Sequence, residues 1–349
     1  MYFHYSSSKS NILIIMKLMW TSVFIFTFFK FVRLELSPDF ANCRKDFFYQ
    51  ETAPILPELK STTQICQKLG NKSYFATEYD TEKRIPLYSA YTLSFEKCGK
   101  RENDWFFEAK LADIDDPNMI EMDYENHNYS RTSIYGSRQA VEEDFKQTDY
   151  DKGHLNPQMF HCESSDSRKA TNTMTNIAPQ YFLFNQNIWN MFETDLYNIS
   201  KVYCSFEGAR RFYITGVKPS FSDYISDGRV NVPTHYWTAV CCDSSGVKGA
   251  NRSAGWSMAF KGENVKNSTI YIYTIQNFFP TDFYKLFADY TDENGNTVSN
   301  CLFNPTKADT ITDEIATRTD IHYVKVKTSV NNSNETNDSF DGPKNRNEL

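Results

Sequence analysis

The sequence lacks three features that would each have placed the chain in a definite class. It has no excess of positive charge, since 37 basic side chains stand against 44 acidic ones. Its eight cysteines form no Cys-x-x-Cys pair, the spacing typical of structural zinc sites. Its apolar run from Leu18 to Phe29 has 12 residues, fewer than the ~20 that cross a bilayer. These absences argue against a zinc-ribbon protein, a membrane span and a protein that coats nucleic acid through general charge.

The start of the chain has the character of a targeting segment. Lys17 precedes the apolar run, and residues 1–34 contain no acidic side chain, as in a secretory signal peptide. Met16 is an alternative start, and an uncleaved anchor is the alternative to cleavage because residues 31–37 lack a clear small-residue site. We expect a signal peptide at 1–34, one globular domain at 35–327 and a polar, disordered tail at 328–349. No stable membrane span is expected.

Cysteine and asparagine usage point to the secretory pathway. An even number of cysteines behind a signal segment predicts disulfides, although the sequence cannot choose their pairing. The last residues, Arg346 to Leu349, loosely resemble an endoplasmic-reticulum retrieval signal, so the lumen of that compartment is the alternative to export. Sequons for N-glycosylation outside the tail begin at Asn71, Asn128, Asn198, Asn251 and Asn267.

The pattern of apolar segments predicts an α+β protein. Aromatic and β-branched runs spread along the chain, with few βαβ spacings and no internal repeat, favour a mostly antiparallel central sheet flanked by helices. Residues 113–149 are polar, and we expect them to form a mostly irregular segment on the surface. Strands are expected at 74–79, 85–95, 105–109, 211–217, 235–241 and 269–275, and helices at 138–145, 183–201 and 280–290.

The stretch from Tyr150 to Glu193 carries the residue types that metal-assisted phosphodiester cleavage requires. His154 can act as a general base near neutral pH, and the amide oxygen of Asn185 suits a hard cation such as Mg²⁺. Gly153 is expected to allow close approach of the backbone to substrate, and Asp151 to orient the loop or the histidine. Each residue alone has an ordinary structural explanation, and the pair His161-Cys162 is only a weak indication of metal binding.

Together these residues resemble a known family. Asp151-Lys152-Gly153-His154, then Asn176 to Gln180, then Asn185 to Glu193 resemble the DNA/RNA non-specific endonucleases of the ββα-metal (His-Me finger) class. The resemblance implies that fold, Mg²⁺ with Mn²⁺ as an alternative, and DNA and RNA as substrates.

The resemblance also implies a role for each matching residue. His154 would be the general base, Asn185 the metal ligand, and Glu193 would act through water bound to the metal. Asn176 matches a further active-site asparagine. Lys152 replaces the arginine of the signature and keeps its charge without its bidentate geometry. Arg131 and Arg138 are candidates to supply a positive charge to the transition state, and nothing in the sequence selects one of them.

Across about residues 40–305 the chain more narrowly resembles the endonuclease-domain-containing 1 branch of this family. Segments at 75–80, 85–91, 139–145 and 230–242 carry that likeness. Cys98 and Cys162 fall outside the pattern of the branch and are candidates to pair with each other. We therefore expect a secreted, Mg²⁺-dependent endonuclease without a specific protein partner. One alternative is a nucleic-acid-binding homologue that has lost turnover, and the reason to consider it is Lys152 in place of the signature arginine. The other alternative is a disulfide-rich interaction protein.

Overall fold

The computed structural model describes residues 40–56, 62–278 and 285–326. The expected signal peptide at 1–34 and the expected tail at 328–349 lie outside these residues. No helix in the described ranges is both long and apolar enough to cross a membrane.

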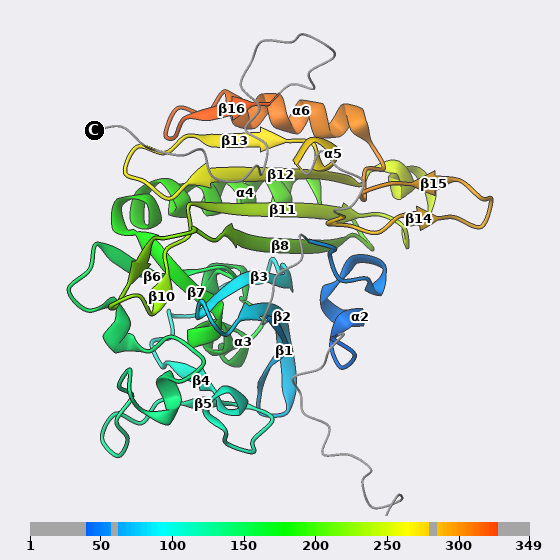
Figure 1. Ribbon diagram of the computed structural model, residues 1–349. Helices are drawn as coiled ribbons and strands as arrows, with labels where there is room; N and C mark the ends of the chain where they lie inside the picture. Colours follow the sequence, from blue (N-terminus) through cyan, green and yellow to red (C-terminus); the bar gives the residue numbers. More distant parts are fainter. Residues whose placement is uncertain (1–39, 57–61, 279–284, 327–349) are drawn as a thin grey trace, which may run out of the picture. The chain divides into compact units, whose positions relative to one another are not determined.

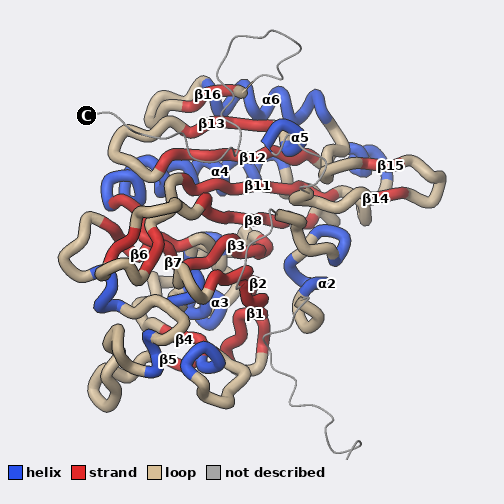
Figure 2. Tube along the Cα trace, viewed as in Figure 1, coloured by secondary structure: helices blue, strands red, loops and turns tan. Residues whose placement is uncertain are grey.

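The centre of the fold is an eight-stranded sheet with the order β1-β2-β3-β8-β11-β12-β13-β16 (Figures 1 and 2). Neighbouring strands are antiparallel, except that β13 and β16 are parallel. The expectation of an α+β fold with a mostly antiparallel sheet is confirmed. The strands are β1 Thr62–Leu69, β2 Lys72–Asp80, β3 Ile85–Thr92, β8 Arg210–Lys218, β11 His235–Asp243, β12 Trp256–Glu263, β13 Ile270–Tyr273 and β16 Tyr323–Lys325.

Both faces of the central sheet are covered, and strand β11 shows why. Successive side chains of a strand point to opposite faces. Tyr236 and Val240 of β11 belong to one apolar cluster, whereas Trp237 and Ala239 belong to another on the opposite face. A strand that is apolar on both sides is stable only where helices cover both faces of its sheet.

Helices α4 and α6 supply apolar side chains to the first cluster, and α2 and α5 supply them to the second. In α4, Phe192, Leu196 and Ile199 are buried, at the i, i+4, i+7 spacing of one helix face. Helix α6 begins where the Asn304 side chain accepts a hydrogen bond from the Lys307 amide, a strong N-cap. The helices are α2 Arg44–Phe47, α3 Ser165–Thr171, α4 Asn190–Tyr203, α5 Ile275–Phe278 and α6 Pro305–Ala316, with a π-helical turn, η7, at Phe184–Trp189.

Short strand pairs and 3₁₀ turns surround the central sheet. One pair, β6 with β7, leads directly into η7 and α4. The pairs are β4 Phe106–Glu108 with β5 Met119–Glu121, β6 Tyr150–His154 with β7 Ile177–Tyr181, β9 Tyr224–Ile225 with β10 Val230–Asn231, and β14 Tyr290–Thr291 with β15 Thr297–Val298. The 3₁₀ turns are η1 Tyr49–Glu51, η2 Ala109–Ala112, η3 Ile134–Gly136, η4 Glu142–Phe145, η5 Gln158–Phe160, η6 Met174–Asn176 and η8 Gly249–Ser253.

All eight cysteines lie in disulfides. The adjacent Cys241 and Cys242 in β11 point to opposite faces of the sheet, so they reach different partners. The expected pairing of Cys98 with Cys162 is confirmed. The bridges are Cys43–Cys66, Cys98–Cys162, Cys204–Cys242 and Cys241–Cys301.

Two expected helices differ from the structure. Of the helix expected at 138–145, only the 3₁₀ turn η4 forms, because Val141 is extended at its start and Ala140 and Asp144 are drawn into the interior. The helix expected at 280–290 begins outside the described residues, and its described part is not helical because Lys285 makes a β-bridge with Ile55. Strands β1 and β12 and helix α6 were not expected from the sequence.

Candidate active site

A β-hairpin followed by a helix carries the residues that the sequence singled out. In the hairpin, His154 at the end of β6 pairs with Ile177 at the start of β7. The chain then enters the π-helical turn η7, which contains Asn185, and continues as α4, which contains Glu193. Wide turns of this kind are rare and often occur at functional sites. This β-β-α order is the one that the resemblance implied.

The hairpin and the helix border a cavity of about 490 Å³. It contains both carboxylates and cations, with apolar walls between them. Five of the sequence-predicted residues line it, namely Asp151, Lys152, His154, Asn185 and Glu193. The other lining residues are Arg101, Trp105, Pro157, Gln158, Met159, Gln186 and Asn190.

Asp151 fixes the orientation of Asn185. The carboxylate Oδ2 of Asp151 accepts hydrogen bonds from Nδ2 of Asn185 and from Nε2 of Gln186, each at 2.9 Å. With its amide nitrogen committed, Asn185 keeps its Oδ1 as the available atom. Amide and carboxylate oxygens are the ligands that Mg²⁺ prefers, so this pair fits a divalent ion. The expected role of Asp151 was to orient the loop or the histidine, whereas its side chain contacts the amides of η7.

The orientation of His154 is set by an amide pair behind it. Nδ2 of Asn172 donates to the backbone oxygens of Glu102 and Asp104, at 3.0 and 3.2 Å. Its Oδ1 therefore faces the other way and accepts from Nε2 of Gln158 and from Nε2 of His154, both at 3.1 Å. A ring nitrogen that meets an amide oxygen must carry the hydrogen. Nε2 therefore carries a hydrogen toward Asn172, and a hydrogen bond to the backbone of Lys152 also orients the ring.

The environment keeps His154 neutral and Glu193 protonated at neutral pH. Burial lowers the pKa of His154 to about 4, and the positive charges of Arg101 and Lys152 act in the same direction. Burial raises the pKa of the Glu193 carboxyl to about 8. Two titratable groups pushed in opposite directions within one cavity are characteristic of functional sites. A cation in the cavity would favour the ionised form of Glu193.

Lys152 lies over the ring of Trp105, with its Nζ 3.6 Å from the ring centroid. The ring of Trp105 also lies 5.6 Å from that of His154. Burial lowers the pKa of Lys152, while the nearby carboxylate of Glu142 opposes that effect. A cation–π contact of this kind holds a lysine side chain in one place. The Lys152 ammonium is therefore a positioned positive charge in the cavity.

Gly153 has a packing role that differs from the expected one. A Cβ atom at this position would come within 2.4 Å of the Gln180 side chain and 2.9 Å of the Tyr236 hydroxyl. Glycine is therefore required because β6 lies directly against neighbouring side chains of the protein interior. The expectation that its small size serves the approach of substrate is not what the packing shows.

Asn176 is the one sequence-predicted site residue that does not line the cavity. It is fully buried. Its Oδ1 accepts from the Asn156 amide and from the Ser89 hydroxyl, and its Nδ2 donates to the backbone oxygens of Asn156 and Thr171. Asn176 therefore ties the residues after His154 to β3 of the central sheet.

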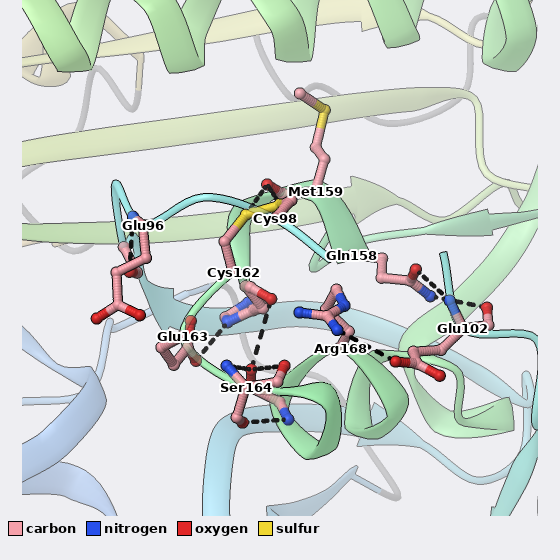
Figure 3. The surroundings of a disulfide bond; sticks show 12 residues. Glu96, Cys98, Glu102, Gln158, Met159, Cys162, Glu163, Ser164 and Arg168 are labelled. Carbon is pink, nitrogen blue, oxygen red and sulfur yellow. Dashed lines mark hydrogen bonds and ion pairs between the residues drawn. A yellow bond between two sulfur atoms is a disulfide. The ribbon is translucent and has the colours of Figure 1, made fainter. Parts of the chain in front are cut away.

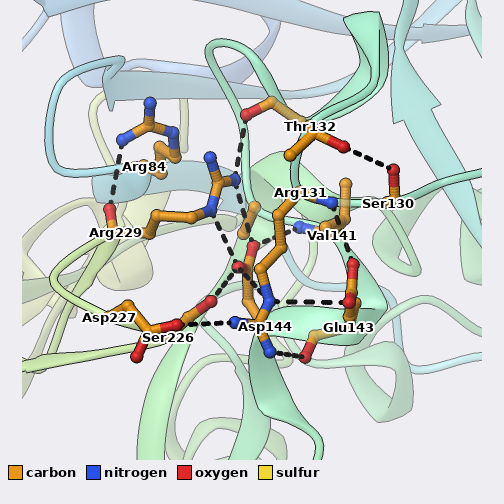
Figure 4. A network of polar contacts seen from close by, with 12 residues as sticks. Arg84, Ser130, Arg131, Thr132, Val141, Glu143, Asp144, Ser226, Asp227 and Arg229 are labelled. Carbon is orange, nitrogen blue, oxygen red and sulfur yellow. Dashed lines mark hydrogen bonds and ion pairs between the residues drawn. The ribbon is translucent and has the colours of Figure 1, made fainter.

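Two arginines were candidates to supply a positive charge to the transition state, and neither of them lines the cavity. Arg131 lies in a polar network with Glu143 and the buried Asp144 (Figure 4). Arg138 donates to the backbone oxygens of residues 110 and 111 and pairs with Asp113. The arginine that does line the cavity is Arg101. No motif in the sequence distinguishes it from the others.

Sequence spacing also did not indicate Trp105, Gln158 and Asn172. They act through contacts that form only in three dimensions, since Glu102 is 70 residues from Asn172 and 56 from Gln158. The weak metal signal at His161-Cys162 is explained otherwise, because Cys162 is in a disulfide and His161 bonds to Asn156. Within the described ranges, no group of three or more His, Cys, Asp or Glu side chains is placed to hold a metal.

Comparison with known proteins finds relatives among the endonucleases. The human endonuclease domain-containing 1 protein is 34% identical over 223 residues, which are 63% of this chain and 41% of that protein. The mouse protein of the same name is 30% identical over 222 residues, with the same two shares. This chain thus spans about two fifths of the length of these curated relatives.

A chain in the crystal structure of the EndoG/EndoGI complex aligns with a TM-score of 0.39 and 19% identity, covering 60% of this chain and 76% of that one. The family described as DNA/RNA non-specific endonuclease matches residues 56–290, well over half of the sequence and all of the cavity-lining residues. This chain belongs to the family of DNA/RNA non-specific endonucleases.

Proposed function

We propose that this chain is a secreted, Mg²⁺-dependent endonuclease that hydrolyses phosphodiester bonds of DNA and RNA with little sequence preference. The observation that carries the proposal is the cavity at the ββα unit. It holds a neutral, oriented histidine opposite an asparagine whose oxygen is left available by its own hydrogen bond.

In this proposal His154 removes a proton from the attacking water. Asn172 holds the ring in its orientation. General base catalysis by a positioned side chain contributes typically ~10²–10⁴-fold. The low pKa of His154 keeps the base unprotonated throughout the physiological range.

A divalent ion at Asn185 would supply Lewis-acid stabilisation of the phosphate and of the leaving oxygen. Asn185 would provide the direct ligand, and Glu193 would act through water. Lys152 and Arg101 place two positive charges in the same cavity, where they can meet the phosphate of the substrate. In a chain whose net charge is −7, these local cations supply the attraction that the surface as a whole lacks.

Two further observations support export from the cell. The four disulfides are stable in an oxidising compartment. The five sequon asparagines in the described residues are exposed: Asn71, Asn128, Asn198, Asn251 and Asn267.

The test is cleavage of plasmid DNA and of RNA by the purified chain, with Mg²⁺ or with EDTA. His154→Ala is the active-site variant, and His127→Ala is the matched control because His127 is exposed and does not line the cavity. We expect cleavage only with Mg²⁺, lost in the first variant and kept in the second. Cleavage that survives His154→Ala would contradict the assignment of the base.

The second candidate is a homologue that binds nucleic acid without cutting it. It is favoured by Lys152, which replaces the signature arginine. This candidate predicts binding of DNA that depends on Lys152 and Arg101, with intact substrate in every metal condition. Binding and cleavage measured on the same sample separate the two.

A further inference from the structure

The segment between β3 and β4 reaches the catalytic cavity with little support of its own. It has no regular secondary structure, and residues 97–101 make none of the backbone hydrogen bonds in the described part of the chain. Its covalent attachment is the Cys98–Cys162 bridge, which joins positions 64 residues apart (Figure 3). Without the bridge, residues 97–101 would keep only the packing of Gly99 against Arg168 and their attachment at Glu102.

Four residues after Cys98, the segment is fixed again at Glu102. The Glu102 carboxylate bonds to Ser165 and to Arg168 at the start of the following helix, α3. Its backbone N–H and C=O both bond to the Gln158 amide, at 2.9 and 3.1 Å. Figure 3 shows the bridge together with Glu102 and its partners Gln158 and Arg168.

Arg101 lies between these two attachments and lines the catalytic cavity. Its positive charge contributes to the low pKa of His154, so the guanidinium and the imidazole act on each other across the cavity. Arg101 has no ion pair or side-chain hydrogen bond within the described ranges to hold it there. Its position therefore depends on the two ends of the short loop.

The Cys98–Cys162 bridge is also the most accessible of the four. Cys98 is exposed, whereas the six cysteines of the other bridges are at most 3% exposed. A thiol must reach a sulfur atom to exchange with a disulfide. A dithiol at moderate concentration should therefore reduce this bridge first and leave the folded core crosslinked.

We propose that the Cys98–Cys162 bridge positions Arg101 in the catalytic cavity, and that its reduction by a dithiol lowers turnover reversibly. The inference rests on the proposed nuclease function. A thiolate of the dithiol attacks one sulfur of the bridge and releases the other as a thiolate. The second thiol then closes the reagent into a disulfide. Two electrons and two protons pass to Cys98 and Cys162, which become thiols, and the dithiol is oxidised.

The test compares the oxidised and the dithiothreitol-treated full chain, both in Mg²⁺. Alkylation and mass mapping establish that only Cys98 and Cys162 are reduced. We expect kcat for DNA cleavage to fall about tenfold, the lower end of the effect of losing an outer positioning contact. The acid limb of the pH profile should move upward, because His154 loses part of the opposing charge. Reoxidation should restore both kcat and the original position of the acid limb.

Two variants separate positioning from general weakening of the fold. Arg101→Ala should already be slow, and treatment with dithiothreitol should not slow it further if the bridge acts through Arg101. Cys98→Ser combined with Cys162→Ser should resemble the reduced enzyme and should not respond to the reagent. Unchanged kcat and an unchanged pH profile after reduction of the bridge would overturn the inference. So would a fall of kcat in Arg101→Ala, on treatment with dithiothreitol, as large as the fall in the parent chain.

Failure of the proposed function gives a different result. In that case the oxidised chain shows no Mg²⁺-dependent cleavage at all. Amide exchange then decides whether the bridge holds the loop. Equal protection of residues 99–102 before and after reduction would overturn the positioning role, and faster exchange after reduction would support it.

Discussion

The amide nitrogen of Asn185 donates to the carboxylate of Asp151 at 2.9 Å across the ββα unit. Two residues 34 positions apart thus decide together which atom of the asparagine faces the cavity. An amide left free to rotate presents its nitrogen as readily as its oxygen, and only the oxygen can bind a cation. The position of Asp151 in the signature is explained by this contact.

Asp151→Asn should therefore weaken metal binding. The new amide can present its nitrogen to Asn185 and so reverse the orientation of the ligand. Loss of such an outer contact typically costs ~10–100-fold in metal affinity. Titration of activity with Mg²⁺, supported by calorimetry, measures the change. The control is Asp149→Asn, at an exposed position on the same approach to the hairpin. Equal Mg²⁺ affinity in the two variants would contradict the orienting role.

Asn172→Asp should convert the neutral base into one that protonates near neutral pH. A carboxylate 3.1 Å from Nε2 of His154 would stabilise the imidazolium and raise the pKa of His154 by about one to three pH units. In the parent chain the pKa is about 4, so kcat measured at saturating Mg²⁺ should persist at pH 5. In the variant the acid limb should move toward neutrality. The pH profile of kcat, with the exposed Asn294→Asp as control, checks the shift. An unmoved acid limb would exclude Asn172 as the partner of the base.

Glu193 predicts a pH-dependent affinity for the metal. Its pKa of about 8 means that the carboxyl is protonated at pH 6–7 in the metal-free protein. A cation favours the charged form, so binding must release this proton. Affinity should rise with pH, by at most about tenfold per pH unit, up to about pH 8 and then level off. Glu193→Gln should bind Mg²⁺ with an affinity that changes little over this range. Calorimetry in buffers of different ionisation enthalpy counts the released proton, and release of no proton at pH 6.5 would contradict the prediction.

The site residues that could be predicted from sequence are those that lie in one local unit. His154, Asn185 and Glu193 belong to a hairpin and the helix that follows, so their spacing along the chain carries the geometry. Arg101 and Asn172 reach the site through contacts between distant segments. Such contacts depend on side-chain hydrogen bonds and a disulfide, and these leave no periodic trace in a sequence.

The same difference between local sequence and distant contacts explains which strands could be predicted. Strands β3 and β11 were predicted because aromatic, apolar and β-branched residues make up most of each strand. Strand β1, Thr62–Leu69, is polar at several positions and becomes a strand through pairing with β2. Asn176 was predicted as a site residue because its surroundings match the family. Its burial and its hydrogen bonds show that Asn176 connects the residues after His154 to β3 of the sheet.

Lys152→Arg tests whether the departure from the family signature limits activity. An arginine can keep the contact with Trp105 through its planar face and can bond a phosphate with two N–H groups, which an ammonium cannot do. One added charge-assisted hydrogen bond is worth about 1.5 kcal/mol or more, so kcat/KM should rise about tenfold. Lys146→Arg is the matched control, because Lys146 is exposed and outside the cavity. Since Lys152 already supplies the charge, an increase would show that geometry limits the parent enzyme. Unchanged kcat/KM would instead mean that the ammonium over Trp105 serves the site as well as the family arginine does.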